Sequence, residues 1–221
     1  MPLLGSAINV DVLIEQLQLA EELRDRGSSM FTPQDLPGRY GRVIGAVDRV
    51  LAAMRCPALL AGGWAVWRHG YLGRVTQDVD IVLPADRVDE FLQVADVSGF
   101  ESLPSRPGRW PKLKDKETGI QVDILPEGAR PGSTTAPAPT TIRSPDDMGA
   151  TAGTLTYLGL PETIELKLAA GRQRDLADVV ELIRSNPDKT AQVRLHLASV
   201  HDSYVAKFDH CTADAQQQQD Q

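Results

Sequence analysis

Acidic and apolar side chains alternate from Asp78 to Ile81 in the segment 77–83, which reads Gln-Asp-Val-Asp-Ile-Val-Leu. A period of two is typical of a β-strand, in which successive side chains point to opposite faces of the sheet. Asp78 and Asp80 therefore share one face, whereas Val79 points with other apolar residues into a core. This strand predicts a sheet with one buried face and two neighbouring carboxylates on the other face.

Helical and extended patterns alternate along the rest of the chain. Apolar residues at steps of three and four predict helices over 8–26, 40–54, 64–69, 86–97, 161–185 and 188–209. Short apolar or alternating runs predict further strands over 58–61, 109–116, 119–125 and 154–158, with a hairpin turn at 117–119. The stretch 127–146, rich in Pro, Thr and Gly, is expected to be a long loop. The pattern predicts an α/β (α+β) fold with a small mixed sheet flanked by helices.

The length of 221 residues suits one domain with helical additions. We expect an N-terminal helical region over 1–56, a core that contains the sheet over 57–160, C-terminal helices over 161–210 and a disordered tail over 211–221. No stretch is apolar over the length of a membrane helix, and no signal segment is visible, so no membrane partner is expected.

The net charge and the two cysteines indicate which binding partners and which cellular compartment to expect. The formal net charge of −7 disfavours a large polyanionic partner, although one basic patch could bind phosphates: Arg106, Arg109, Lys112, Lys114 and Lys116. Cys56 and Cys211 fit no metal-ligand spacing, which favours a reducing, cytoplasmic setting.

Asp123 is a third candidate carboxylate. It lies in the alternating segment 120–125 and points away from the apolar face of that segment. If this strand pairs with 77–83, three carboxylates converge on one point. Such clusters hold the two divalent cations of phosphoryl-transfer sites, and carboxylate oxygens suit Mg²⁺ or Mn²⁺. Without that pairing, each acid would be an ordinary solvent-facing residue on a strand.

Gly62-Gly63 lies where the apolar strand 58–61 gives way to a short helix. Glycines at such a junction let a backbone approach phosphates closely, and the helix N-terminus offers free N–H donors. A tight turn without a ligand is the alternative explanation of a lone glycine pair.

The order of these motifs resembles the nucleotidyltransferase superfamily typified by DNA polymerase β. Its signature is a Gly-Gly or Gly-Ser pair, a helix, an Asp-x-Asp strand and a later third acid. Three segments, 61–83 (AGGWAVWRHGYLGRVTQDVDIVL), 122–132 (VDILPEGARPG) and 160–183 (LPETIELKLAAGRQRDLADVVELI), look like blocks of the minimal, AbiEii-like bacterial branch. The resemblance covers about 57–185. One departure is the fourteen-residue interval between Gly63 and Asp78, which is long for the family.

The resemblance implies which residues bind substrate and metal. The glycine pair 62–63 and Thr76 would bind the nucleoside triphosphate (NTP). Asp78, Asp80 and Asp123 would be the metal ligands and the catalytic carboxylates, with Mg²⁺ or Mn²⁺ as the cofactor. The third acid, Asp123, would also orient or deprotonate the acceptor hydroxyl.

Lys167 is a further candidate for binding the triphosphate. If 162–183 is one continuous helix, Lys167, Gly171, Asp175 and Asp178 share a stripe on its surface. Lys167 would then act as a point charge on the phosphates. The alternative is a solvated helix with internal ion pairs. The resemblance favours a function for Lys167 and leaves the role of Asp175 open.

The function that the resemblance implies is metal-dependent transfer of a nucleoside monophosphate from an NTP to an acceptor hydroxyl. The acceptor could be a small molecule such as an aminoglycoside-like alcohol, an RNA 3′ end or a protein hydroxyl. Several members of the AbiEii-like branch are toxins, which adds a toxin role and a cognate antitoxin to the expectations. The alternative from another class is a non-catalytic nucleotide-binding or regulatory protein that retains the fold.

Overall fold

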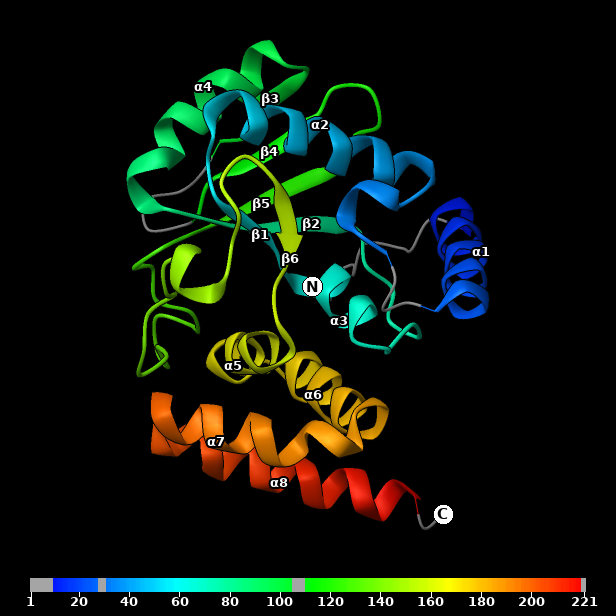
Figure 1. The fold of residues 1–221 in the computed structure, drawn as a ribbon, viewed down its shortest axis with the longest axis vertical. Helices are drawn as coiled ribbons and strands as arrows, with labels where there is room; N and C mark the ends of the chain where they lie inside the picture. The colour runs from blue at the N-terminus through cyan, green and yellow to red at the C-terminus, as the bar shows by residue number, and fades with distance from the viewer. Residues whose placement is uncertain (1–9, 28–30, 105–109, 220–221) are drawn as a thin grey trace, which may run out of the picture.

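A six-stranded mixed sheet forms the centre of the computed structural model, which describes residues 10–27, 31–104 and 110–219 (Figure 1). Its strands lie in the order β3-β4-β5-β2-β1-β6. Their bounds are β1 (Ala58–Leu60), β2 (Asp78–Leu83), β3 (Phe100–Ser102), β4 (Lys112–Asp115), β5 (Gln121–Pro126) and β6 (Leu155–Tyr157). The central strand β2 runs parallel to β5 and antiparallel to β1, and β3, β4 and β5 are successively antiparallel. The predicted fold class is therefore confirmed.

Helices lie on both sides of the sheet. Their bounds are α1 (Val10–Arg26), α2 (Gly38–Met54), α3 (Gly62–Arg68), α4 (Val88–Val97), α5 (Leu160–Ala170), α6 (Gln173–Ser185), α7 (Thr190–Val200) and α8 (Asp202–Gln219). Short 3₁₀ turns occupy Pro33–Asp35, Ala85–Arg87, Asp146–Met148 and Pro187–Lys189. Among the described residues, no helix combines the length and the apolar character that crossing a membrane requires.

The alternation in β2 and β5 decides which face of the sheet is buried under helices. Val79, Ile81 and Val122 are fully buried in one cluster with the apolar sides of α2 and α4. Figure 1 shows these two helices on one side of the sheet and α5 to α8 stacked at the opposite end of the molecule. The C-terminal helices pack on one another and reach the sheet through α3, whose Val66 is buried in their cluster. The acidic face of β2 therefore lies between the sheet and the C-terminal helices α5 to α8.

The two long C-terminal helices expected from the sequence are each broken, which corrects that prediction. Gly171 adopts φ +65° and ends α5, and its N–H donates to the Lys167 carbonyl. This left-handed conformation, which favours glycine, lets α6 turn back and pack against α5. The second break lies at His201, whose extended backbone separates α7 from α8.

The disorder predicted for 211–221 is also wrong as far as Gln219, because α8 continues to that residue. Its buried stripe extends from Tyr204 and Phe208 through Cys211 to Ala215, at helical spacing. Burial of this stripe against the neighbouring helices stabilises the tail, because an amphipathic helix gains most of its stability from packing. Residues 220 and 221 lie outside the described part of the chain.

The remaining differences are small. The predicted hairpin is present as β4 and β5, and the predicted helix at 64–69 begins two residues earlier, at Gly62. The strand β3 was missed because its three residues follow α4 directly and show no alternation of their own. Both cysteines are free and buried. The first residues of the predicted helix over 8–26 lie outside the described residues.

Candidate active site

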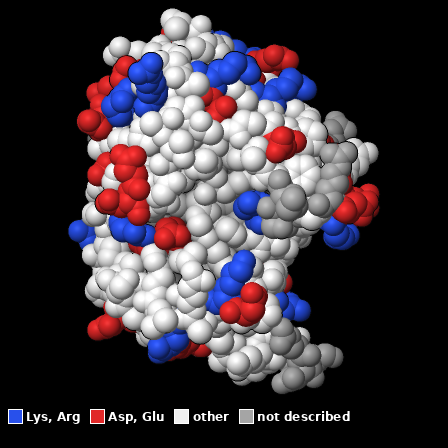
Figure 2. Space-filling model, viewed as in Figure 1, with Lys and Arg blue, Asp and Glu red and all other residues white. Residues whose placement is uncertain are grey.

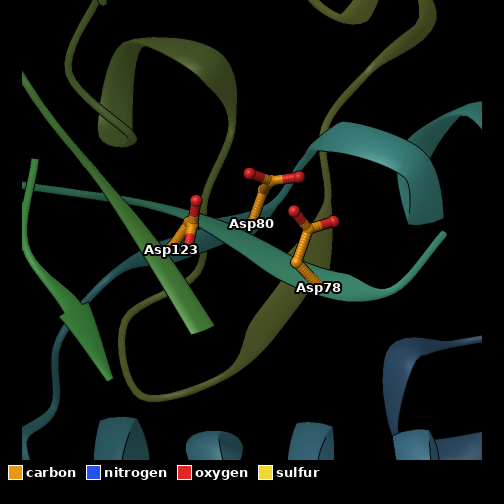
Figure 3. A group of neighbouring side chains, drawn as sticks. All are labelled: Asp78, Asp80 and Asp123. Atoms are coloured by element: carbon orange, nitrogen blue, oxygen red, sulfur yellow. The ribbon is translucent and has the colours of Figure 1, made fainter. Parts of the chain in front are cut away.

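Parallel pairing of β2 with β5 brings three carboxylates together (Figure 3). Asp80 lies directly opposite Asp123 in the strand register, and Asp78 precedes Asp80 by two residues on the same face. One carboxylate oxygen from each residue lies within 4.8 Å of those from the other two. The strand pairing on which the sequence argument depended is therefore present, and the three side chains point to the same side of the sheet.

The cluster concentrates negative charge in a partly buried place. Burial, together with repulsion from Asp78 and Asp123, raises the pKa of Asp80 from 3.8 to about 7. The positive charges of Lys167 and Arg74 oppose this rise. Near neutral pH, the cluster therefore favours binding of a proton or of another cation.

Asp123 has two oxygens in different surroundings. Its Oδ2 lies 2.5 Å from the Nζ of Lys112, which stands opposite Asp123 on the neighbouring strand β4. Its Oδ1 is buried and has no hydrogen-bond partner among the described residues. A buried carboxylate oxygen without a partner is energetically costly, so a cation or a donor from outside the protein would stabilise Oδ1.

The two glycines permit a contact that no other residue would permit. Gly62 adopts φ +60°, and a Cβ there would lie 1.7 Å from Asp80 Oδ2. A Cβ on Gly63 would lie 2.1 Å from the Nη1 of Arg74 and 2.3 Å from the Oγ1 of Thr76. The backbone at the N-terminus of α3 therefore lies directly against the carboxylate cluster.

Thr76 does not offer a free backbone group to a ligand. The side-chain amide of Gln16, on α1, accepts from the Thr76 N–H at 2.9 Å and donates to the Thr76 carbonyl. Thr76 and Gln16 are both buried, and the Thr76 hydroxyl contacts the carbonyl of Asp78 at 3.5 Å. Thr76 thus positions the start of β2, and the predicted contact of Thr76 with nucleotide stays a prediction.

Lys167 lies in a buried ion network rather than on a solvated helix surface. Its Nζ is 2.6 Å from Asp178 Oδ2 and 3.2 Å from Asp175 Oδ1, and its side chain is 7% exposed. Arg74 and Arg172 complete the network through Nε contacts with Asp178 at 2.9 Å and Asp175 at 2.5 Å. The alternative is therefore wrong in expecting a solvated helix, whereas the ion pairs that it expected are present. The grouping arises from the packing of α5 on α6, not from one continuous stripe.

The ion network adjoins the carboxylate cluster. Arg74 contacts Asp178 with its Nε, and its Nη1 is buried without a partner beside Gly63. Lys167 lowers the pKa of Asp80 by its charge, which requires the two groups to be near one another. Arg74, which lies beside Gly63, therefore links the ion network to the backbone that lies against Asp80.

The donor set suits a hard divalent cation. All three candidate ligands are carboxylates, and one of their oxygens is buried without a partner. Mg²⁺ and Mn²⁺ prefer such oxygen ligands, whereas zinc sites usually include histidine or cysteine. Asp78, Asp80 and Asp123 therefore fit a magnesium or manganese site by their chemistry.

Other residues considered from the sequence have structural contacts. Trp64 and Trp67 are buried, and their indole N–H groups donate to the carbonyls of Asp78 and Arg74. The expected basic patch is not a free phosphate site in its described part, because each lysine faces an acid. The pairs are Lys112 with Asp123, Lys114 with Glu101 and Lys116 with Asp96. Arg106 and Arg109 lie outside the described residues, and Figure 2 shows blue and red residues interspersed over the visible face.

The sequence argument did not identify two contacts of the site. The pairing of Lys112 with Asp123 follows from the predicted hairpin, because a turn at 117–119 places these two positions opposite one another. No local signal indicates Gln16, since it contacts a residue sixty positions away.

Comparison with known proteins gives structural neighbours and no sequence match. No family model and no curated protein matches the chain. A solution structure of the antibiotic-resistance factor ANT(2'')-Ia is similar with a TM-score of 0.46 and 16% identity, over 76% of this chain and 95% of that chain. A crystal structure of ANT(2'')-Ia in complex with adenylyl-2''-tobramycin has a TM-score of 0.39 and 16% identity, over 80% of this chain and 97% of that chain.

Proposed function

We propose that this protein is a nucleotidyltransferase, which transfers a nucleoside monophosphate from an NTP to an acceptor hydroxyl and releases pyrophosphate. One observation carries the proposal. Three carboxylates from two adjacent parallel strands meet beside a glycine pair at a helix N-terminus, and one of their oxygens is buried without a partner. The arrangement offers negative charge for metal ions and a backbone close enough to contact phosphates.

In this proposal, Asp78, Asp80 and Asp123 hold Mg²⁺ or Mn²⁺. The metal, when bound, supplies charge neutralisation for the phosphates and for the oxygens that attack and leave. The N-terminal turn of α3 at Gly62-Gly63 orients the triphosphate beside the carboxylates. Lys167 is already engaged by two carboxylates, so its charge acts on phosphates across the network, together with Arg74.

The bond changes define what the protein's own groups must do. The acceptor oxygen forms a bond to the α-phosphorus, and the bond from that phosphorus to the bridging oxygen of pyrophosphate breaks. The acceptor proton needs a base. Asp123 is proposed for that role because its Oδ1 has no partner within the described structure. Asp80, with a pKa raised to about 7, must lose its proton before it can bind a cation.

The acceptor stays open among a small alcohol, an RNA 3′ end and a protein hydroxyl. The net charge of −7 favours a small or cationic acceptor. The resemblance to the AbiEii-like branch supports RNA or protein instead, with a toxin role and an antitoxin partner. We therefore propose the transfer reaction without choosing an acceptor, and its test includes each of these three acceptor classes.

The test is a product assay with each NTP labelled at the α-phosphate, with Mg²⁺ or Mn²⁺. Parallel reactions contain a set of small alcohols, total RNA or total protein as the acceptor. Transfer of label with release of pyrophosphate is expected for the wild-type chain, and loss of both is expected for Asp78→Asn. The matched control is Asp89→Asn, which removes an exposed carboxylate on α4, away from the cluster.

Three outcomes separate the proposal from its alternative. Label transfer that survives in Asp78→Asn contradicts the assignment of the site. NTP binding that depends on Mg²⁺, with no transfer to any acceptor, supports the non-catalytic nucleotide-binding alternative. Absence of NTP binding in a folded wild-type protein contradicts both functions.

A further inference from the structure

The ion pair between Lys112 and Asp123 places a positive charge of the protein within the carboxylate cluster. Lys112 lies on β4 directly opposite Asp123 on β5, so the strand register holds the two side chains together. Its Nζ is 2.5 Å from Asp123 Oδ2. Among the contacts of the three carboxylates, this is the direct ion pair that the described structure records.

A metal ion bound to Asp123 would lie next to this ammonium. A ligating carboxylate oxygen lies about 2.0–2.1 Å from Mg²⁺, so an ion bound through the unpartnered Oδ1 would sit across the same carboxylate from the ammonium on Oδ2. Both cations would also repel one another across the Asp123 carboxylate. The ammonium therefore weakens the binding of a metal ion to Asp123 unless it withdraws.

Lys112 is able to withdraw. Its side chain is 44% exposed, whereas that of Lys167 is 7% exposed and tied to two carboxylates. A flexible lysine stem can move its ammonium into solvent without disturbing the core. Lys167 therefore holds its charge in a fixed place, whereas the charge of Lys112 can be displaced.

We propose that Lys112 is a displaceable counter-cation of Asp123 that sets the order in which cations enter the cluster. This inference rests on the proposed function, since it concerns the same carboxylates. Asp78 and Asp80 carry no such direct ion pair in the described structure and accept a cation first. Asp123 binds a cation through its unpartnered Oδ1 more weakly until the Lys112 ammonium leaves the carboxylate.

Lys114 is a matched control within the same strand. It lies two residues from Lys112 on the same face of β4, and its side chain is 43% exposed. Its ammonium contacts Glu101 at 3.1 Å, which lies on β3, away from Asp123. A substitution at Lys114 therefore removes an equal charge from the strand without changing the partner of Asp123.

The experiment is a titration of the full chain with Mn²⁺ alone, in which electron paramagnetic resonance measures the free ion. The variants are Lys112→Met, Lys114→Met and Asp80→Asn, and thermal unfolding checks that each is folded. Removal of a unit charge that repels a divalent ion at contact range corresponds to about tenfold in affinity, even when water screens it. We expect Lys112→Met to bind the later Mn²⁺ ion, the one that Asp123 ligates, about tenfold more tightly, and Lys114→Met to match the wild type.

The outcomes distinguish this inference from the function on which it rests. Equal Mn²⁺ affinity in Lys112→Met and Lys114→Met, with binding lost in Asp80→Asn, overturns the role of Lys112 and leaves the metal site intact. Equal binding in the wild type and Asp80→Asn overturns the metal site and this inference together. If Lys112→Met is unfolded, Lys112→Gln decides, because it also removes the charge and should show the same tightening.

Discussion

Replacement of Asp80 by asparagine should stabilise the metal-free protein while it destroys the proposed metal site. The folded protein raises the pKa of Asp80 from 3.8 to about 7 because the carboxyl is buried beside Asp78 and Asp123. A raised pKa means that the folded state holds a proton which the unfolded chain has lost. The associated stability is present below about pH 4 and is lost as the pH rises to about 7. Asparagine has no charge to bury, so Asp80→Asn escapes this loss.

The size of the effect follows from the two pKa values. The difference between 3.8 and about 7 sets a ceiling of about 4 kcal/mol above pH 7. Solvent reaches the side chain in part, and the nearby charges of Lys167 and Arg74 are worth less once Asp80 is neutral. We therefore expect Asp80→Asn to be about 1–3 kcal/mol more stable than the wild type at pH 8. The gap should be smaller at pH 5 and should stop growing above about pH 7.

The assay is urea unfolding at pH 5, 6, 7 and 8 in the presence of a chelator, with Asp89→Asn as the control. Addition of Mg²⁺ should then raise the stability of the wild type but not that of Asp80→Asn, because a ligand stabilises only the state that binds it. The control should follow the wild type throughout. A wild type that is as stable as Asp80→Asn at pH 8, or a gap that does not change with pH, would refute the account of a strained carboxylate cluster.

Three further substitutions test the surroundings of the cluster. Gly62→Ala places a Cβ against Asp80 Oδ2, so isothermal calorimetry should show loss of metal and NTP binding in a protein that still folds; unchanged binding would contradict the close approach. Lys167→Met removes one of the two cations that contact the buried carboxylate of Asp178, the other being Arg74, and should cost about 1.5–3 kcal/mol in urea unfolding. A change within about 0.5 kcal/mol, as for a surface lysine, would contradict its burial. Gln16→Met removes two buried hydrogen bonds to the backbone before β2 and should cost about 1–3 kcal/mol, with faster amide exchange in that segment; unaltered exchange would show that α1 does not hold it.

The sequence by itself determined the faces of the two acidic strands and their local neighbours. A period of two sends Asp78 and Asp80 to one face and apolar residues to the other, whatever the rest of the fold does. The same argument placed Asp123, and the hairpin turn set its partner on β4. These features could be predicted because they depend on residues that are close together in the chain. The glycine pair at the start of α3 belongs with them, since a strand, a turn and a helix follow one another directly.

Only the tertiary structure decided that β2 and β5 are parallel neighbours, because about forty residues separate the two strands and no local pattern records their pairing. The same holds for the ion network of Lys167, which the sequence argument placed on one helix and the structure builds between two. Gly171 ends the first helix, and packing of the second against it brings the carboxylates of Asp175 and Asp178 to the lysine. Long-range contacts of this kind arise where the burial of apolar surface brings distant segments together. Packing, rather than periodicity, therefore determined the convergence of the three carboxylates and the ion pairs of Lys167.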